Sequence, residues 1–153
     1  MPLKTASILT ALAIQIIETE EIRKFLQSDI SIRQSYTKDD LYKQNILPMT
    51  ATMTVDERNM HPFGKLSGGA SLAMAECLAG FASRLFCLEN EFPSGLQVSG
   101  SHIASASKGE NLLATAKLIH KGKKTHIWDV EITNSQARLI SSVKVTNMII
   151  QLK

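Results

Sequence analysis

The sequence has few cysteines and prolines, and it lacks any long run of basic or apolar residues. Two cysteines and four prolines occur among 153 residues, of which 44% are hydrophobic and 20% are charged. That composition is typical of a globular domain and excludes a disordered or membrane-spanning chain. The net charge of +3 is not gathered into a basic block, so nucleic acid is not predicted as a partner. Without an internal repeat, this length fits one domain.

The two cysteines, Cys77 and Cys87, fall within one stretch whose sequence predicts a helix. Ten residues of helix span about 15 Å, which is too far for a disulfide. We therefore expect two reduced thiols in the core of a cytoplasmic protein. Small buried hydrophobes are the favoured interpretation of both residues, ahead of a catalytic thiol.

Residues 1–45 are predicted to form a helical extension and a connection before the main domain. Residues 6–27 have the periodicity of an amphipathic helix. The apolar side of this helix carries Leu9, Leu12, Ile16 and Phe25. Lys4 and the apolar residues after it resemble the start of a secretion signal, but no small-residue cleavage site follows and the helical pattern continues. Residues 28–44 are polar and are expected to form the connection.

Residues 46–153 have the pattern of an α+β domain. Apolar residues alternate with polar ones over residues 49–55, which predicts a half-buried strand. Residues 69–88 contain no proline and are apolar or small nearly all round, which predicts a buried helix about 30 Å long. Turn residues then separate four β-branched segments. These predict strands at 96–105, 112–119, 125–133 and 139–150. This order predicts an antiparallel sheet wrapped around a central helix.

The predicted central helix contains a single acid, Glu76. Its neighbours three and four positions away are Leu72, Ala73, Ala79 and Gly80, and none of them can pair with a carboxylate. A carboxylate in apolar surroundings is costly unless it has a partner from elsewhere. We therefore interpret Glu76 as a functional carboxylate. The alternative is an acid that faces solvent or pairs with a basic residue across an interface.

The start of the same helix is a second candidate. Gly68 and Gly69 leave backbone N–H groups without intrahelical partners, and the helix dipole adds positive potential, so this terminus can hold a polarised carbonyl oxygen. A tight strand-to-helix turn, with Ser67 as its N-cap, is the plainer alternative. Glu76 lies about 12 Å further along the helix, too far to share one reacting carbon. Cooperation of the two would need two subunits, and hence a dimer with shared sites.

Residues 61–76, HPFGKLSGGASLAMAE, resemble the hotdog-fold acyl-CoA thioesterases. The similarity is to the 1,4-dihydroxy-2-naphthoyl-CoA hydrolases of menaquinone biosynthesis and to the 4-hydroxybenzoyl-CoA and phenylacetate-type thioesterases, and it covers roughly residues 47–150. The resemblance implies a hotdog fold and hydrolysis of an acyl-CoA to the free acid and CoA. It implies that Glu76 is nucleophile or general base and that the Gly68 N–H polarises the carbonyl. It also implies sites between the subunits of a homodimer, and dimers that commonly pair into a homotetramer.

Two positions depart from the pattern of that family. His61 stands where many members have glutamine, and Ser67 stands where they have histidine. His61 can still donate a hydrogen bond to a substrate oxygen and Ser67 can still cap the helix, so both are expected to position the acyl carbonyl. Aromatic hydroxyacyl groups, such as 1,4-dihydroxy-2-naphthoyl, and medium-chain acyl groups both fit the sequence.

A CoA thioester carries several phosphates, so a basic surface is expected to bind it. The candidates are the lysines of a predicted hairpin at 121–124 and two weaker positions elsewhere. They are Lys121, Lys123, Lys124, Lys108 and His102. For any single lysine, a solvated turn is the alternative. No metal or redox cofactor is expected, since His120 and His126 have no further ligands near them in the sequence.

Together these features predict a cytoplasmic acyl-CoA thioesterase whose partner is its substrate, with neither nucleic acid nor a membrane involved. Two alternatives remain on the same fold. One is a non-catalytic module that binds acyl-CoA or an acyl carrier, which the departures at His61 and Ser67 motivate. The other is a dehydratase, which would hydrate an enoyl thioester and which we rank last.

Overall fold

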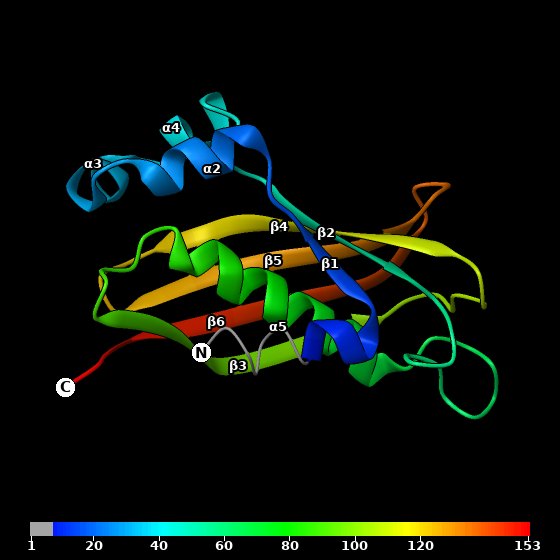
Figure 1. Ribbon diagram of the computed structural model, residues 1–153. Coiled ribbons are helices and arrows are strands. Elements are labelled where there is room, and N and C mark those ends of the chain that lie inside the picture. Colours follow the sequence, from blue (N-terminus) through cyan, green and yellow to red (C-terminus); the bar gives the residue numbers. More distant parts are fainter. Residues whose placement is uncertain (1–7) are drawn as a thin grey trace.

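The computed structural model describes residues 8–153 and shows one antiparallel sheet curved around a long helix (Figure 1). This is the α+β arrangement predicted from the sequence. The six strands follow the order β1-β2-β4-β5-β6-β3 across the sheet. The strands are β1 (Ile14–Ile17), β2 (Met49–Thr54), β3 (Glu91–His102), β4 (Asn111–Lys121), β5 (Thr125–Asn134) and β6 (Leu139–Gln151). The helices are α2 (Glu20–Gln27), α3 (Ile30–Ser35), α4 (Lys38–Lys43) and α5 (Gly68–Arg84), and residues 8–12 are also helical.

The five predicted strands and the central helix are present, with changes at some ends. β3 runs from Glu91 to His102, so it begins and ends earlier in the chain than the strand predicted at 96–105. Its first residues already pair with β6. α5 ends at Arg84 instead of residue 88. The next two backbone carbonyls accept hydrogen bonds from side chains of α3, so tertiary contacts take the place of helical ones there.

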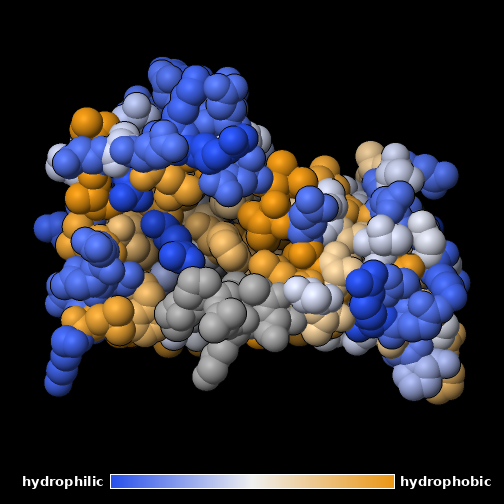
Figure 2. Space-filling model, in the orientation of Figure 1, coloured by the Kyte–Doolittle hydropathy of each residue, from blue (hydrophilic) through white to orange (hydrophobic). Residues whose placement is uncertain are grey.

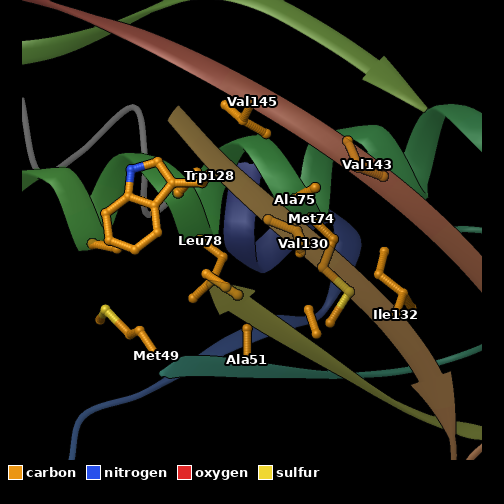
Figure 3. Packing of buried hydrophobic residues seen from close by; sticks show 14 of the residues in the cluster. Met49, Ala51, Met74, Ala75, Leu78, Trp128, Val130, Ile132, Val143 and Val145 are labelled. Carbon is orange, nitrogen blue, oxygen red and sulfur yellow. The ribbon is translucent and has the colours of Figure 1, made fainter. Parts of the chain in front are cut away.

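The helix α5 packs one of its sides against the concave face of the sheet. The residues on that side are Ala70, Met74, Ala75, Leu78, Ala79 and Ala82, all of them buried. Figure 3 shows Met74 and Leu78 beside Val130 of β5, in the centre of this core. The opposite side of α5, which includes Glu76, is half-buried or exposed. The expectation of a helix buried all round is therefore wrong for a single chain, because one sheet covers only one side.

The strand β5 alternates between core and surface as its sequence predicted. The buried side carries His126, Trp128, Val130 and Ile132. On the outer side, Asp129 lies 3.6 Å from Lys144 and Glu131 lies 3.6 Å from Lys117, each across a pair of neighbouring strands. These exposed pairs contribute little stability, so the sheet depends on its apolar side.

A buried polar contact fixes the C-terminal part of α5 on the sheet. The indole Nε1–H of Trp128 donates to Ser83 Oγ at 2.8 Å. The side chain of Asn147 on β6 donates to the same oxygen at 3.0 Å and to the carbonyl of Ala79 at 3.2 Å. Buried polar groups need hydrogen-bond partners, and in this contact the indole, the hydroxyl and the amide satisfy one another.

The N-terminal residues differ from the single helix predicted for 6–27. Residues 8–12 are helical, Ala13 adopts a positive φ of 63°, and β1 then pairs with β2. The isoleucines of β1 favour an extended strand beside an existing sheet over a continuous helix. A new helix, α2, begins after Thr19, whose hydroxyl accepts the N–H of Ile22. Residues 6 and 7 of the predicted helix lie outside the described residues.

The polar connection predicted for residues 28–44 folds into α3 and α4. Asp29 and Thr37 cap these helices by accepting backbone N–H groups. Three buried side chains, Ile22, Phe25 and Leu41, join the same core as the sheet and α5. The extension therefore packs on the domain where α5 ends (Figure 1). Within residues 8–153, no helix has the length and apolar character needed to cross a membrane.

Candidate active site

Glu76 lies in the middle of α5, and its carboxylate reaches the backbone of β3 at Gly95. A Cβ at Gly95 would overlap Oε1 of Glu76 and would lie 3.2 Å from its Cδ. The pairing of β3 with β6 shifts by one residue just after Gly95. Glu76 is exposed in the single chain and lines a cavity of about 480 Å³ together with Phe92 and Pro93. The predicted apolar burial of this carboxylate is thus wrong for one chain, in which it faces an open cavity.

Gly95 is a site residue that the sequence did not indicate, because it precedes the strand predicted at 96–105. In the structure it belongs to β3 and permits the close approach of Glu76. A glycine inside a strand often marks such an approach. Only the folded chain shows that Gly95 lies inside β3 and that Glu76 is the group that approaches it.

Gly68 lies in a second cavity, of about 360 Å³, at the start of α5. His102, the last residue of β3, packs against it, and a Cβ on Gly68 would lie 2.7 Å from His102 Nε2. Ser141 on β6 holds this ring, with its Oγ 2.9 Å from His102 Nδ1. The buried hydroxyl of Ser71 also lines the cavity and has no hydrogen-bond partner within the described part of the chain. The helix start is therefore surrounded by groups able to exchange hydrogen bonds with a ligand.

His61 lines the same cavity as Gly68. Its Nδ1 accepts the backbone N–H of Phe63 at 3.1 Å, so the neutral ring carries its proton on Nε2 and can donate from there. Ser67 occupies the N-cap position of α5 with an extended backbone, but its hydroxyl makes no capping hydrogen bond. The expectation that the Ser67 side chain caps the helix is therefore wrong. The Ser67 carbonyl accepts the N–H of Ala70 at 3.1 Å, so the Ser67 hydroxyl leaves only the N–H groups of Gly68 and Gly69 free of a capping bond from this residue.

The Glu76 cavity and the Gly68 cavity have no lining residue in common. The two residues are separated by two turns of α5, about 12 Å along the helix axis. One chain therefore does not bring both groups to one reacting carbon, as the spacing of Gly68 and Glu76 in the sequence predicted.

Lys121 links the β4–β5 hairpin to the N-terminal extension. Its Nζ donates to the carbonyl of Gln34 at 3.1 Å and to that of Tyr36 at 3.4 Å. The same ammonium lies 5.1 Å from the centre of the Phe86 ring. Burial lowers the pKa of Lys121. These contacts give Lys121 a structural role in holding the extension on the domain.

The other basic candidates are spread over the molecule. Lys123 and Lys124 are exposed on the hairpin beside Lys121, at the end of the sheet where α5 ends. Lys108 forms an ion pair with Glu57, and His102 lies against Gly68 at the opposite end of the helix. The five residues predicted to bind CoA phosphates therefore do not form one surface within a single chain.

His126 is buried beneath the hairpin, and its burial, aided by the charge of Lys121, lowers its pKa to about 4. The unfolded chain takes up this proton near pH 6.5, whereas the folded chain resists it until about pH 4. We therefore expect stability to fall as the pH drops through this window, by about 3 kcal/mol in total. Urea unfolding at several pH values measures the loss.

The matched control for this pH effect uses the exposed His120. His126→Gln should remove most of the pH dependence between 6.5 and 4, whereas His120→Gln should keep it. Equal pH dependence in both variants would show that His126 is not the group responsible.

Neither cysteine has the properties of a nucleophile. Both are free, as predicted, and Cys77 is half-buried while Cys87 is buried. Burial raises the pKa of Cys77, with a smaller contribution from Glu76, and raises that of Cys87 to about 11. Both thiols therefore stay protonated at neutral pH. Residues 8–153 contain no group of three or more histidine, cysteine or acidic side chains placed to hold a metal ion.

Comparison with known proteins places this arrangement in a family. The model of the thioesterase superfamily matches residues 63–141. The 1,4-dihydroxy-2-naphthoyl-CoA hydrolase of Escherichia coli is 37% identical over 103 residues, which are 67% of this chain and 74% of that protein. The proofreading thioesterase EntH of Cronobacter sakazakii is 32% identical over 102 residues, 67% of this chain and 74% of that one.

A solved structure extends the likeness to nearly the whole chain. The crystal structure of a thioesterase from Haemophilus influenzae superposes with a TM-score of 0.73 at 26% identity, covering 94% of this chain and 82% of that one. The matched segment includes Gly68 and Glu76, the two residues around which the cavities are built. The chain therefore belongs to the thioesterase superfamily of hotdog-fold enzymes and is a thioester hydrolase.

Proposed function

We propose that this protein hydrolyses acyl-CoA thioesters with Glu76 as nucleophile or general base. The observation that carries the proposal is the position of Glu76, whose carboxylate stands free in a cavity against the backbone of β3. No basic side chain of the described residues forms an ion pair with Glu76. The carboxylate is therefore available to attack a carbonyl carbon or to take a proton from water.

The second half of the site comes, in this proposal, from a partner subunit. β3 is a long strand at the edge of the sheet, and its outer backbone groups can pair with another strand. Glu76 lies over Gly95, whereas Gly68 lies against His102 near the other end of β3. Antiparallel pairing of two β3 strands reverses their direction, so a pairing centred between these positions brings Glu76 of one copy toward Gly68 of the partner subunit. Two identical sites result.

The chemistry follows from these two halves. The N–H groups at the start of α5 polarise the carbonyl oxygen and stabilise the negative charge that develops on it. Attack by Glu76, or by water from which Glu76 takes the proton, then breaks the bond between the carbonyl carbon and sulfur. The CoA thiolate leaves and takes up a proton, and water supplies the hydroxyl of the free acid. His61 and His102 are placed to donate hydrogen bonds to the oxygen or the departing sulfur.

Among acyl groups, we propose an aromatic hydroxyacyl thioester such as 1,4-dihydroxy-2-naphthoyl-CoA as the first substrate to test, with a place in cytoplasmic menaquinone biosynthesis. The name of the Escherichia coli relative supports this choice. We also propose that two such dimers pair to form a homotetramer. Family membership favours hydrolysis over both the non-catalytic binding module and the dehydratase considered from the sequence.

An acyl-CoA panel with detection of the released thiol tests the proposed function. Aromatic and aliphatic acyl-CoA thioesters should release CoA at rates well above uncatalysed hydrolysis. The same acyl groups presented as oxygen esters should react far more slowly. Binding of every thioester without release of thiol would contradict the proposal and favour a binding module.

Gly95→Ala tests whether the approach of Glu76 to β3 matters for catalysis. The added methyl group would occupy space now held by the end of the Glu76 side chain, which is flexible and exposed, so Glu76 moves while the strand stays. A displacement of about 1 Å from the working geometry costs on the order of 100-fold in rate. We expect kcat/KM to fall by about that factor with little change in Tm.

Ser99→Ala is the control, since it also places an alanine at an exposed position of the same strand but adds no atom beside Glu76. It should leave both kcat/KM and Tm unchanged. Full activity of Gly95→Ala would show that the position of Glu76 at β3 is not the working one.

A further inference from the structure

The cavity of about 360 Å³ at the start of α5 is lined by groups that can donate hydrogen bonds. The backbone N–H of Gly68 has no partner within the helix, because it belongs to the first turn. The hydroxyl of Ser71 is buried and has no partner among the described residues. Figure 2 shows hydrophilic residues gathered at the end of the molecule that holds the loop before α5, whereas hydrophobic residues lie near the middle of the same face. The cavity is therefore suited to a ligand atom that accepts hydrogen bonds.

His102 reaches this cavity from β3, and Ser141 of β6 lies beside it. The two residues are directly opposite each other in the pairing of β3 with β6. Ser141 is 1% exposed, and its Oγ lies 2.9 Å from His102 Nδ1. The other ring nitrogen, Nε2, lies against Gly68, where an added Cβ would be only 2.7 Å away. A buried hydroxyl therefore engages one nitrogen of the ring, and the other nitrogen is left for a ligand in the cavity.

The direction of the hydrogen bond between Ser141 and His102 follows from the burial of Ser141. A buried hydroxyl needs an acceptor for its proton. Among residues 8–153, the side chain of Ser141 makes one hydrogen bond, and its partner is His102 Nδ1. If Nδ1 carried the ring proton, the hydroxyl would accept that bond and its own proton would have no acceptor. Ser141 therefore donates to Nδ1, and the neutral ring carries its proton on Nε2.

We propose that Ser141 is a positioning residue for thioester hydrolysis, an inference that rests on the proposed function. By donating to Nδ1, Ser141 holds the ring of His102 in place and keeps the ring proton on Nε2, beside Gly68. The Nε2–H and the Gly68 N–H then both donate to the carbonyl oxygen of the thioester. These hydrogen bonds strengthen as negative charge develops on that oxygen, which lowers the barrier to attack on the carbonyl carbon. His102 keeps its proton throughout.

Of the two histidines that line the cavity, His102 is the one placed beside Gly68. His61 belongs to the loop before α5, and its ring is held by the backbone N–H of Phe63 in the same loop. His102 is held instead by a buried side chain of the neighbouring strand. A ring fixed to the sheet is the better support for a donor that must stay in one position relative to the helix start.

The protonation of His102 can be tested without measuring activity. In protein labelled with ¹⁵N at histidine, NMR distinguishes a ring nitrogen that carries a proton from one that does not. The signals absent from the spectrum of His102→Gln belong to His102. In alkaline buffer, Nδ1 should be unprotonated and Nε2 should carry the proton. A proton on Nδ1 in the unaltered protein would overturn the proposal.

His102→Gln and His102→Asn test whether a donor is needed at the position of Nε2. Glutamine can place its side-chain NH₂ group where Nε2 now lies, whereas the NH₂ group of asparagine reaches only as far as Nδ1. His102→Asn should lower kcat about 100-fold, the cost of removing one donor to a developing oxyanion, with little change in KM. His102→Gln should keep kcat within about tenfold of the unaltered protein. Equal losses in the two variants would overturn the role of the Nε2–H.

Ser141→Ala tests the positioning role in two backgrounds. With His102 present, it should lower kcat about tenfold, because the ring loses the bond that fixes its place and its tautomer. In the His102→Gln background the same change should have no further effect, because the NH₂ group of glutamine donates without help from Ser141. An equal loss in both backgrounds would show that Ser141 only supports the pairing of β3 with β6, and it would overturn the proposal.

Ser142→Ala is the control, because Ser142 is the next residue on β6 and is exposed. It should leave kcat unchanged, and Tm values should show that all variants are folded. An equal loss from Ser141→Ala in both backgrounds, with hydrolysis intact in the unaltered protein, would leave the proposed function standing. Failure of the unaltered protein to release CoA from any thioester would overturn the proposed function and this role with it.

Discussion

Glu76→Gln is expected to lower kcat/KM for acyl-CoA hydrolysis on the order of 10³-fold, because the amide can neither attack the carbonyl nor accept a proton from water. The loss should appear in kcat, since glutamine keeps the size of the side chain and its contact with β3. Stability should change little, because Glu76 is exposed and forms no ion pair within residues 8–153. Steady-state kinetics with thiol detection, together with the Tm, separates the two effects. Turnover within tenfold of the unaltered protein would remove Glu76 from the mechanism.

The Glu76 variant also tests whether the sites are shared between subunits. Gly68→Val should be inactive for a different reason, because its side chain would displace His102 and crowd the start of α5. In a mixed dimer of the two variants, one site carries both defects and the other carries neither. Refolding the two inactive variants together should therefore restore up to about half of the sites that form in mixed dimers. No recovery, with mixed dimers demonstrated by mass, would contradict a shared site.

Trp128→Ala is expected to have the largest effect on stability, about 3–5 kcal/mol. Trp128 is fully buried between β5 and α5, so its removal leaves a cavity that the surrounding sheet cannot close. It also removes the Nε1–H that donates to Ser83, which leaves that hydroxyl with fewer partners. A loss of this size is a large fraction of the stability of an ordinary domain. Urea or thermal unfolding measures it.

Trp128→Phe separates packing from the hydrogen bond. Phenylalanine keeps much of the apolar volume and loses only the indole N–H, so its effect should be clearly smaller than that of alanine. Asn147 still donates to Ser83 in this variant, which limits the cost. If alanine cost less than about 1 kcal/mol, the packing of α5 on the sheet would not depend on Trp128.

The predictions about the main domain succeeded because periodicity reports directly on which side of an element is buried. β5 shows this most clearly, since Trp128 and Val130 are apolar at every second position and face the core. The prediction of one helix for the N-terminal residues was wrong for a physical reason. The isoleucines of β1 fit a helical pattern by spacing, but they become a strand because the edge of β2 offers backbone partners that no local pattern records.

The candidate site, too, could be predicted only in part from the sequence. A lone acid in an alanine-rich segment and a glycine pair eight residues earlier are visible in the sequence. The roles of Gly95 and Ser141 were not visible, because each depends on contacts with residues far away in the chain. The lysines were misleading for a related reason. Clustering in sequence predicted one basic surface, but Lys121 is drawn into contacts with the extension.

The sequence by itself determined the α+β class, the central helix, the distance that separates Gly68 from Glu76 and the resemblance to the thioesterases. These features depend on local periodicity and on residues a few positions apart, which a sequence records directly. Only the tertiary structure decided that Glu76 faces an open cavity at Gly95, that His102 lies against Gly68 and that the extension packs where α5 ends. Such contacts join segments distant in the chain, and they arise from the way the sheet, α5 and the extension pack together.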